Sequence, residues 1–163
     1  MFTQRNIIMF KGRHLPVCLN LKAYRILMVG GGNVATQKLK TLLQFDCRVT
    51  VVTREANEKV KKMAKKGKIK LCLERFKNSH LKGYDLIYAC TDDSMINERV
   101  ARLAKRKSAL YNIAGHPNLS NFISPAVYRE GKITVAVSTS GTNPPLAVSL
   151  RDAIGKSLNK KRY

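Results

Sequence analysis

Short apolar runs alternate with segments of helical periodicity along the first two thirds of the chain. The apolar runs are rich in β-branched residues and predict buried strands at 25–30, 48–53, 69–73, 85–90 and 109–113. The segments between them predict helices at 33–45, 55–66 and 94–107, the last with Ser94 as its N-cap. Strands that alternate with helices predict an α/β fold, with a doubly wound, mostly parallel sheet and helices on both of its faces.

The pattern changes after about Ile113. Residues 122–128 and 132–138 read as two antiparallel strands, joined by the turn Arg129-Glu130-Gly131. A polar loop then leads to Asn143, which is a suitable N-cap for a final helix that begins with two prolines and reaches about Leu158. We therefore expect a small antiparallel segment followed by one C-terminal helix.

The turn after the first predicted strand carries the pattern G-x-G-x-x-A. A first glycine permits the tight turn, a second lets the backbone approach a pyrophosphate, and a small third residue allows close packing of helix on strand. The turn lies between a predicted strand and a predicted helix, which is the context of a dinucleotide site. The alternative is a glycine turn that only connects two elements. The candidate cofactor-binding residues here are Gly30, Gly31, Gly32, Asn33, Val34 and Ala35.

This motif makes the first unit a candidate Rossmann domain that binds NAD. The chain has 163 residues, which suits one compact unit with a smaller appendage. The expected units are a Rossmann domain at 1–113, an antiparallel segment for dimerisation and substrate binding at 114–143, and a C-terminal helix at 144–163.

The residues for the cofactor's ribose fall at the end of the second strand, at Thr53, Arg54 and Glu55. Glu55 is suited to accept hydrogen bonds from the ribose hydroxyls of NAD, whereas Arg54 is suited to the 2′-phosphate of NADP or to stacking on adenine. A third interpretation places Glu55 in the first turn of a helix, where its charge suits the dipole. The sequence leaves all three open.

The fourth strand ends at Ala89-Cys90-Thr91-Asp92-Asp93. Ligands of open α/β sheets lie at the carboxyl ends of the strands, so Thr91 and Asp92 are expected to line the pocket toward the nicotinamide. The alternative is that Asp92, Asp93 and Ser94 only cap the next helix.

The charge of the chain is strongly unbalanced. Lys and Arg number 31 and Asp and Glu 10, a formal net charge of +21 at pH 7, which favours a polyanionic partner. Seven lysines lie between Lys59 and Lys70, and we interpret them as a solvated helix face. Aromatic residues do not interleave with these lysines and Trp is absent, so no specific nucleic-acid site is expected.

The cysteines and the apolar runs indicate a cytoplasmic protein. Ile7–Phe10 is too short for a signal-peptide core, and no run approaches the ~18 apolar residues of a membrane span. Cys18, Cys47, Cys72 and Cys90 form no C-x-x-C pair and do not cluster as zinc ligands. We expect free cysteines in a reducing compartment and no metal site.

Several segments, in this order and spacing, resemble one family. They are the lead-in Leu15–Leu21, GGGNVA, ACTDD, NIAGHP, NFISPA and VAVSTSGTNPPLA. They resemble the precorrin-2 dehydrogenase and sirohydrochlorin ferrochelatase family, which also forms the N-terminal half of fused siroheme synthases. The resemblance implies NAD⁺-dependent oxidation of the tetrapyrrole precorrin-2 to sirohydrochlorin, Fe²⁺ insertion in some members, and a homodimer built through the antiparallel segment. It also implies further helices over the substrate, so we expect a less enclosed site here.

The sequence departs from the family at its catalytic aspartate. The family's N-V-V-D-x-P segment is matched by Asn112-Ile113-Ala114-Gly115-His116-Pro117, so Gly115 occupies the aspartate position. His116 is a candidate base beside it, or a turn residue before proline. Because Gly115 can neither accept a proton nor bind a metal, we expect chelatase activity to be weak or absent.

The second ligand surface is the loop from Ser138 to Asn143. Hydroxyl and backbone N–H groups before a helix suit a carboxylate, and the resemblance places a tetrapyrrole-site serine at the position of Thr139. The candidate substrate-binding residues are Asn112, Ser138, Thr139 and Ser140. The alternative role of the loop is simple capping. Two functions follow: a tetrapyrrole dehydrogenase, or a non-catalytic module that binds the dinucleotide or the tetrapyrrole.

Overall fold

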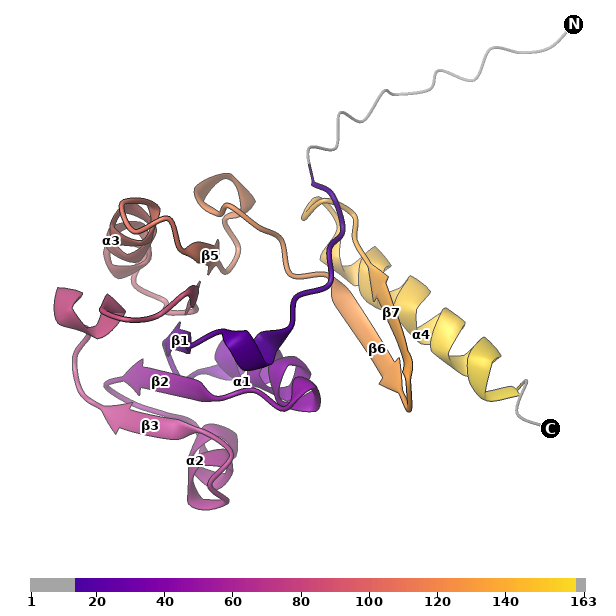
Figure 1. Ribbon diagram of the computed structural model, residues 1–163, viewed down its shortest axis with the longest axis horizontal. Helices are drawn as coiled ribbons and strands as arrows, with labels where there is room; N and C mark the ends of the chain where they lie inside the picture. Colours follow the sequence, from indigo (N-terminus) through magenta and orange to yellow (C-terminus); the bar gives the residue numbers. More distant parts are fainter. Residues whose placement is uncertain (1–13, 161–163) are drawn as a thin grey trace, which may run out of the picture.

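The computed structural model describes residues 14–160, so the expectations for Ile7–Phe10 and for 161–163 lie outside the described residues. A five-stranded parallel sheet has the order β3-β2-β1-β4-β5 (Figure 1). This arrangement confirms the predicted doubly wound sheet. Its strands are β1 (Ile26–Val29), β2 (Val49–Thr53), β3 (Lys70–Leu73), β4 (Leu86–Ala89) and β5 (Leu110–Ile113).

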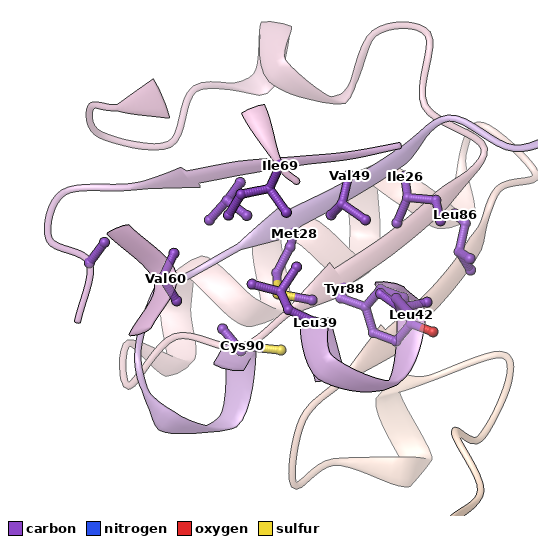
Figure 2. Packing of buried hydrophobic residues seen from close by; sticks show 13 residues of the cluster. Ile26, Met28, Leu39, Leu42, Val49, Val60, Ile69, Leu86, Tyr88 and Cys90 are labelled. Carbon is purple, nitrogen blue, oxygen red and sulfur yellow. The ribbon is translucent and has the colours of Figure 1, made fainter. Parts of the chain in front are cut away.

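Helices cover both faces of the sheet. The helices α1 (Asn33–Leu42) and α2 (Glu58–Lys65) pack against one face, and α3 (Ser94–Lys105) packs against the other. Figure 2 shows the first of these cores, where Leu39 and Leu42 of α1 meet strand residues such as Met28. Strands β1 and β4 are buried at every position, which explains their continuous apolar sequences. Short 3₁₀ turns lie at Leu21–Ala23, Leu43–Phe45, Asn78–Leu81 and Pro117–Leu119.

One predicted helix start and one predicted N-cap were wrong. The second helix begins at Glu58 rather than Glu55, because the Asn57 side chain accepts a hydrogen bond from the Val60 amide at 3.0 Å and caps it. The N-cap of α3 is Asp93 rather than Ser94, since its carboxylate accepts from the Ile96 amide at 3.1 Å. A carboxylate is also favourable beside the positive end of the helix dipole.

A two-stranded antiparallel hairpin and a long helix form the second part of the molecule (Figure 1). The strands are β6 (Ala126–Glu130) and β7 (Ile133–Val137), and the helix is α4 (Pro144–Lys160). The prediction that a strand begins at residue 122 was wrong, because 122–125 instead cover the sheet: the Phe122 ring lies edge-on to Tyr88 with centroids 5.6 Å apart. The turn is formed by Gly131 and Lys132, since Glu130 already pairs with Ile133.

The second part is joined to the first by specific contacts. The Arg129 guanidinium lies 4.7 Å from the centre of the Phe45 ring and donates to the Gln44 carbonyl, just beyond α1. Within the second part, Gly155 of α4 lies against the Tyr128 ring, where an added Cβ would be 2.8 Å away. None of the helices in residues 14–160 is both long and apolar enough to cross a membrane.

Candidate functional site

The glycine turn begins with a residue for which only glycine fits. Gly30 has φ +110°, and a Cβ there would lie 2.4 Å from the Cys90 carbonyl oxygen at the end of β4. Its amide donates to the Val52 carbonyl of β2 at 2.9 Å. The turn is thus fixed at the crevice between β1 and β4, where the strand order reverses and ligands of this sheet class bind.

The next two glycines differ in their surroundings. A Cβ on Gly31 would meet Thr53 Cγ2 at 2.8 Å and the Glu55 carbonyl at 2.9 Å, so Gly31 allows close packing of the turn. A Cβ on Gly32 would have nothing within 4 Å, and Gly32 starts α1 without a side-chain cap. The start of α1 is therefore open beside Gly32 and has no side-chain cap, as expected of a helix start that binds a pyrophosphate.

The other residues of the motif divide by exposure. Ala35 is fully buried between α1 and the sheet, in agreement with the packing role of the third motif position. Asn33 is exposed. Val34 has 51% of its surface exposed, so it lies beside the site rather than in the core.

Asn57 supports the glycine turn and was not among the predicted site residues. Its amide nitrogen donates to Thr36 Oγ1 at 2.9 Å and to Asn33 Oδ1 at 3.3 Å. Its backbone amide donates to the Gly31 carbonyl at 3.0 Å. One residue therefore joins the start of α2 to the start of α1. The signal in the sequence was an Asn directly before Glu58, a helix-start pattern.

The end of β2 lies against the glycine turn. Thr53 Oγ1 donates to the Glu55 carbonyl at 2.7 Å and fixes the local backbone. The side chains of Arg54 and Glu55 are exposed beside the turn. The interpretation that Glu55 lies in the first turn of a helix was wrong, because α2 begins at Glu58. The two interpretations that give Arg54 or Glu55 a role at the ribose remain predictions.

The end of β4 is fixed by a buried amide. Asn97 of α3 is 4% exposed. Thr91 Oγ1 donates to Asn97 Oδ1 at 2.8 Å, and Asn97 Nδ2 donates to the Thr91 carbonyl at 2.8 Å. Asp93 caps α3, while Asp92 is an exposed residue of the connecting turn. Thr91 is therefore held rigidly next to Gly30, and Asp92 is not the helix cap.

A neutral thiol and a half-buried lysine lie behind this edge. Burial raises the pKa of the Cys90 thiol to about 11, with Lys38 opposing the shift. Burial also lowers the pKa of the Lys38 ammonium, whose Nζ lies 5.3 Å from the centre of the Tyr88 ring. Cys90 is thus protonated at neutral pH, which makes it a poor nucleophile.

The turn after β5 presents Gly115 and His116 at the same edge of the sheet. The Ala114 amide donates to the Ala89 carbonyl at 2.9 Å, which holds the ends of β5 and β4 together. Gly115 has φ +76°, and a Cβ built on it has nothing within 4 Å. His116 is exposed, and its carbonyl accepts from Ser120 Oγ at 2.9 Å. There is room for a side chain at Gly115, although glycine supplies none.

The loop at 138–143 packs against this turn. A Cβ on Gly141 would lie 2.9 Å from Ile123 Cδ1 and 3.2 Å from Pro117 Cβ. Inside the loop, Ser138 Oγ accepts from the Ser140 amide at 3.1 Å and Thr139 Oγ1 accepts from the Asn143 amide at 3.1 Å. The structure therefore brings the loop close to the turn that carries Gly115 and His116.

The loop hydroxyls also shape the start of α4. The Asn143 side chain accepts from the Leu146 amide at 3.0 Å, which confirms it as the predicted cap. Ser140 has φ +54°, a left-handed conformation that is uncommon for serine. The loop's own hydrogen bonds fix the backbone at Ser138, Thr139 and Ser140. The role of these three residues in substrate binding stays a prediction.

Asn112 differs from the other predicted substrate residues. It is 7% exposed and its Nδ2 donates to the Phe122 carbonyl at 3.1 Å. Its buried Oδ1 has no hydrogen-bond partner within residues 14–160. Its visible role is to hold the 122–125 segment on the sheet, and a substrate contact stays a prediction. In the same range, no group of three or more His, Cys, Asp or Glu is placed to hold a metal, and the cysteines are free.

Comparisons with known proteins agree with this arrangement. A family model described as putative NAD(P)-binding matches residues 17–126. The siroheme synthases of Methylococcus capsulatus and Nitrosococcus oceani are 39% and 37% identical to the chain, over 141 and 139 residues. The matches cover 86% and 85% of this chain but 30% of each relative, so the chain spans about a third of their length.

A solved structure extends the likeness to the fold. The structure of SirC, a precorrin-2 dehydrogenase, matches with a TM-score of 0.75 and 25% identity, over 88% of this chain and 70% of that one. These similarities confirm the resemblance that the sequence motifs indicated.

Proposed function

The chain belongs to the putative NAD(P)-binding family, and we propose that it is an oxidoreductase of siroheme biosynthesis that oxidises precorrin-2 to sirohydrochlorin with NAD⁺. The similarity to siroheme synthases and to SirC supports this reaction class and this substrate. The observation that carries the proposal is the meeting of two surfaces at one edge of the sheet. The open start of α1 at Gly32 suits a dinucleotide, and the loop around Gly141 packs on the turn after β5.

The first role of the chain's own residues is to bind and orient. The free N–H groups after Gly32 hold the pyrophosphate, while the buried Ala35 and the Asn57 bridge keep α1 and the turn in place. Thr91, fixed by Asn97, lines the crevice toward the nicotinamide. Bound NAD⁺ supplies the hydride acceptor, so the protein's main contribution is to position the two rings.

The preference for NAD⁺ over NADP⁺ rests on the end of β2. The Glu55 backbone packs on Gly31 and its exposed carboxylate is in the region where a ribose is bound. Arg54 is the neighbouring exposed cation and would favour the 2′-phosphate. We infer that Glu55 accepts from the ribose hydroxyls, and a lower Kd for NAD⁺ than for NADP⁺ is the expected result.

The second surface binds the tetrapyrrole. Hydroxyl and amide groups of Ser138, Thr139 and Ser140 lie before the start of α4 and suit substrate carboxylates. Gly115 offers no carboxylate at the position of the family's catalytic aspartate, so chelatase activity is weak or absent. His116 is the exposed candidate for proton transfer beside it.

The assembly we propose is a homodimer in the cytoplasm. Leu146, Leu150 and Ile154 recur every four residues along α4 and are 46%, 46% and 39% exposed. Such an apolar stripe is buried when a second copy covers it. Unpaired cysteines are typical of a reducing compartment and support the cytoplasmic location.

The direct test is anaerobic incubation of the full chain with precorrin-2 and NAD⁺, with NADP⁺ in a parallel reaction. We expect sirohydrochlorin and NADH to appear in equal amounts. If both ligands bind and neither product forms, the chain is a binding module. The missing carboxylate at Gly115 is the observation that favours this second function. If precorrin-2 and NAD⁺ both fail to bind, the proposed function is wrong.

A further inference from the structure

A second concave surface lies at the opposite end of α1 from the glycine turn. The helix has 10 residues and rises about 1.5 Å per residue, so its two ends lie about 15 Å apart. The cavity has a volume of about 330 Å³ and is formed by the last turns of α1 and α2 and the segments that follow them. Its lining residues are Lys40, Leu43, Gln44, Lys62, Met63, Lys66 and Lys68.

The lining carries four lysines and no acidic residue. All four are exposed, and within residues 14–160 none of them has a carboxylate oxygen within 4.0 Å. The nearby Glu58 carboxylate accepts a hydrogen bond from Lys61 at 2.9 Å, and this bond is the main cause that lowers the pKa of Glu58. Lys62 lowers this pKa further by its charge alone. The cavity therefore concentrates positive charge that the described protein does not neutralise locally.

Helix dipoles explain only part of this charge. Lys40 lies in the last turn of α1 and Lys62 in the last turn of α2, where cations are favourable. Lys66 and Lys68 lie beyond the last helical residue of α2 and add charge to the same cavity. Ammonium groups gathered in this way repel one another, and a multivalent anion relieves that repulsion.

The remaining lining residues favour a compact ligand. Leu43 and Met63 are partly buried against the core and give the cavity an apolar floor. The Gln44 carbonyl accepts from Arg129 of β6, which brings a fifth cation to the border of the cavity. Ligand pockets range from about 300 to 1,000 Å³, so a cavity at the low end of this range fits a short phosphate chain better than an extended polymer.

We propose that this cavity is a binding site for an oligophosphate, either a free phosphate chain or the phosphate chain of a nucleotide, separate from the dinucleotide site at Gly32. The lysines neutralise the phosphate oxygens, and the apolar floor accommodates part of a base or sugar when the ligand is a nucleotide. The proposal does not depend on the proposed dehydrogenase activity, since it concerns binding alone.

The test is isothermal titration of the full chain with tripolyphosphate and with ATP, at roughly physiological salt, where weak surface electrostatics are screened. The informative variant is K62Q/K66Q, which removes two cavity lysines. The matched control is K59Q/K65Q, which removes two exposed lysines of α2 that do not line the cavity. We expect one saturable site, weakened about tenfold or more by K62Q/K66Q and less than about twofold by K59Q/K65Q.

The outcomes separate the possible ligands. Similar affinities for tripolyphosphate and ATP indicate that the phosphate chain alone is recognised, and tighter binding of ATP indicates use of the apolar floor; both support the site. Equal weakening by the two variants overturns it, because the binding is then diffuse. In a competition titration, displacement of tripolyphosphate by saturating NAD⁺ also overturns it. A short DNA duplex is titrated in parallel, and binding of the duplex without binding of either phosphate ligand overturns the site, because it indicates a nucleic-acid surface.

Discussion

The parallel sheet and the β6–β7–α4 unit differ in how they bury apolar surface. Among the described residues, the buried hydrophobic core lies between Ile26 and Ile113, with Ala147 as the single later member. The second unit leaves Ile133 of β7 and the stripe of Leu146, Leu150 and Ile154 exposed. The sheet is thus stabilised by its own packing, whereas the second unit leaves apolar surface exposed that the proposed homodimer would bury.

This difference also separates the two halves of the candidate site. Gly30 and Gly31 pack against the chain at the ends of β4 and β2, and the Asn57 amide donates to the Gly31 carbonyl, so the geometry of the glycine turn follows from the sheet and its helices. The 138–143 loop is held by its own hydrogen bonds and by contacts of Gly141 with Pro117 and Ile123. Cofactor binding is therefore expected to be robust, and substrate binding to depend on the second unit and its partner.

The largest effect is a loss of stability, expected from a change at the glycine turn of the sheet. Gly30→Ala places a Cβ 2.4 Å from the Cys90 carbonyl at φ +110°, and we expect a loss of about 3 kcal/mol or more in the free energy of unfolding. Urea denaturation measures this loss. The matched variant Gly32→Ala, which meets no neighbouring atom, is expected to unfold like the wild type; equal destabilisation of both contradicts the geometry.

The next largest effect is a loss of dimer affinity, expected from changes in the exposed stripe of α4. L150K/I154K puts two charges where a second copy would bury apolar side chains, and we expect the dimer Kd to rise about 100-fold or more. Light scattering across a concentration series measures the Kd. Met95→Lys, at a residue of α3 that is 79% exposed, is the control and should leave assembly unchanged. A wild-type chain that stays monomeric at all concentrations would rule out the proposed homodimer.

The turn between the two units gives an intermediate effect. Gly115→Asp places a carboxylate at the position proposed to match the family's catalytic aspartate, and the space around the Cβ is open. Aspartate tolerates positive φ better than most residues, so we expect a stability cost of only about 1 kcal/mol. Iron insertion into sirohydrochlorin, followed by absorbance, is expected to rise about tenfold. Normal chelatase activity in the wild type would contradict the role given to this position.

The last effect is expected at Asn57 and is confined to the start of α2 and the glycine turn. Asn57→Ala removes the cap of α2 and the bridge to Thr36 and Asn33, at an expected cost of about 1–2 kcal/mol. Thermal unfolding measures this change. Asn118→Ala, at an exposed position, is the control. We also expect weaker NAD⁺ binding for Asn57→Ala alone, and identical affinity in both variants would show that the bridge does not position the turn.

The sequence predicted the elements that depend on local patterns. The G-x-G-x-x-A motif and the buried strands are local signals, and the parallel direction of the strands followed from the alternation of strands with helices. The start of α2 was misplaced because apolar periodicity does not show which polar residue makes the cap, and Asn57 does. The start of β6 was misplaced because residues 122–125 are held by Phe122 against Tyr88, a contact made across the fold.

The candidate site was predictable in part for the same reason. Its cofactor half follows from one motif, which also marks Gly30 as a tight turn. The meeting of Gly141 with Pro117 joins residues far apart in sequence and has no local signal. The Thr91–Asn97 pair could likewise not be predicted, because it depends on how α3 packs and brings the buried Asn97 amide to Thr91.

The central claim is that the edge of the sheet at Gly32 binds the dinucleotide that oxidises the substrate. The most direct measurement compares wild type and Gly32→Ala for coupled formation of NADH and sirohydrochlorin under anaerobic conditions. We predict a one-to-one ratio in the wild type, and a rate at least about tenfold lower in Gly32→Ala with an unchanged unfolding midpoint. Equal rates in the two proteins, or sirohydrochlorin formed at the same rate without dinucleotide, would contradict the claim.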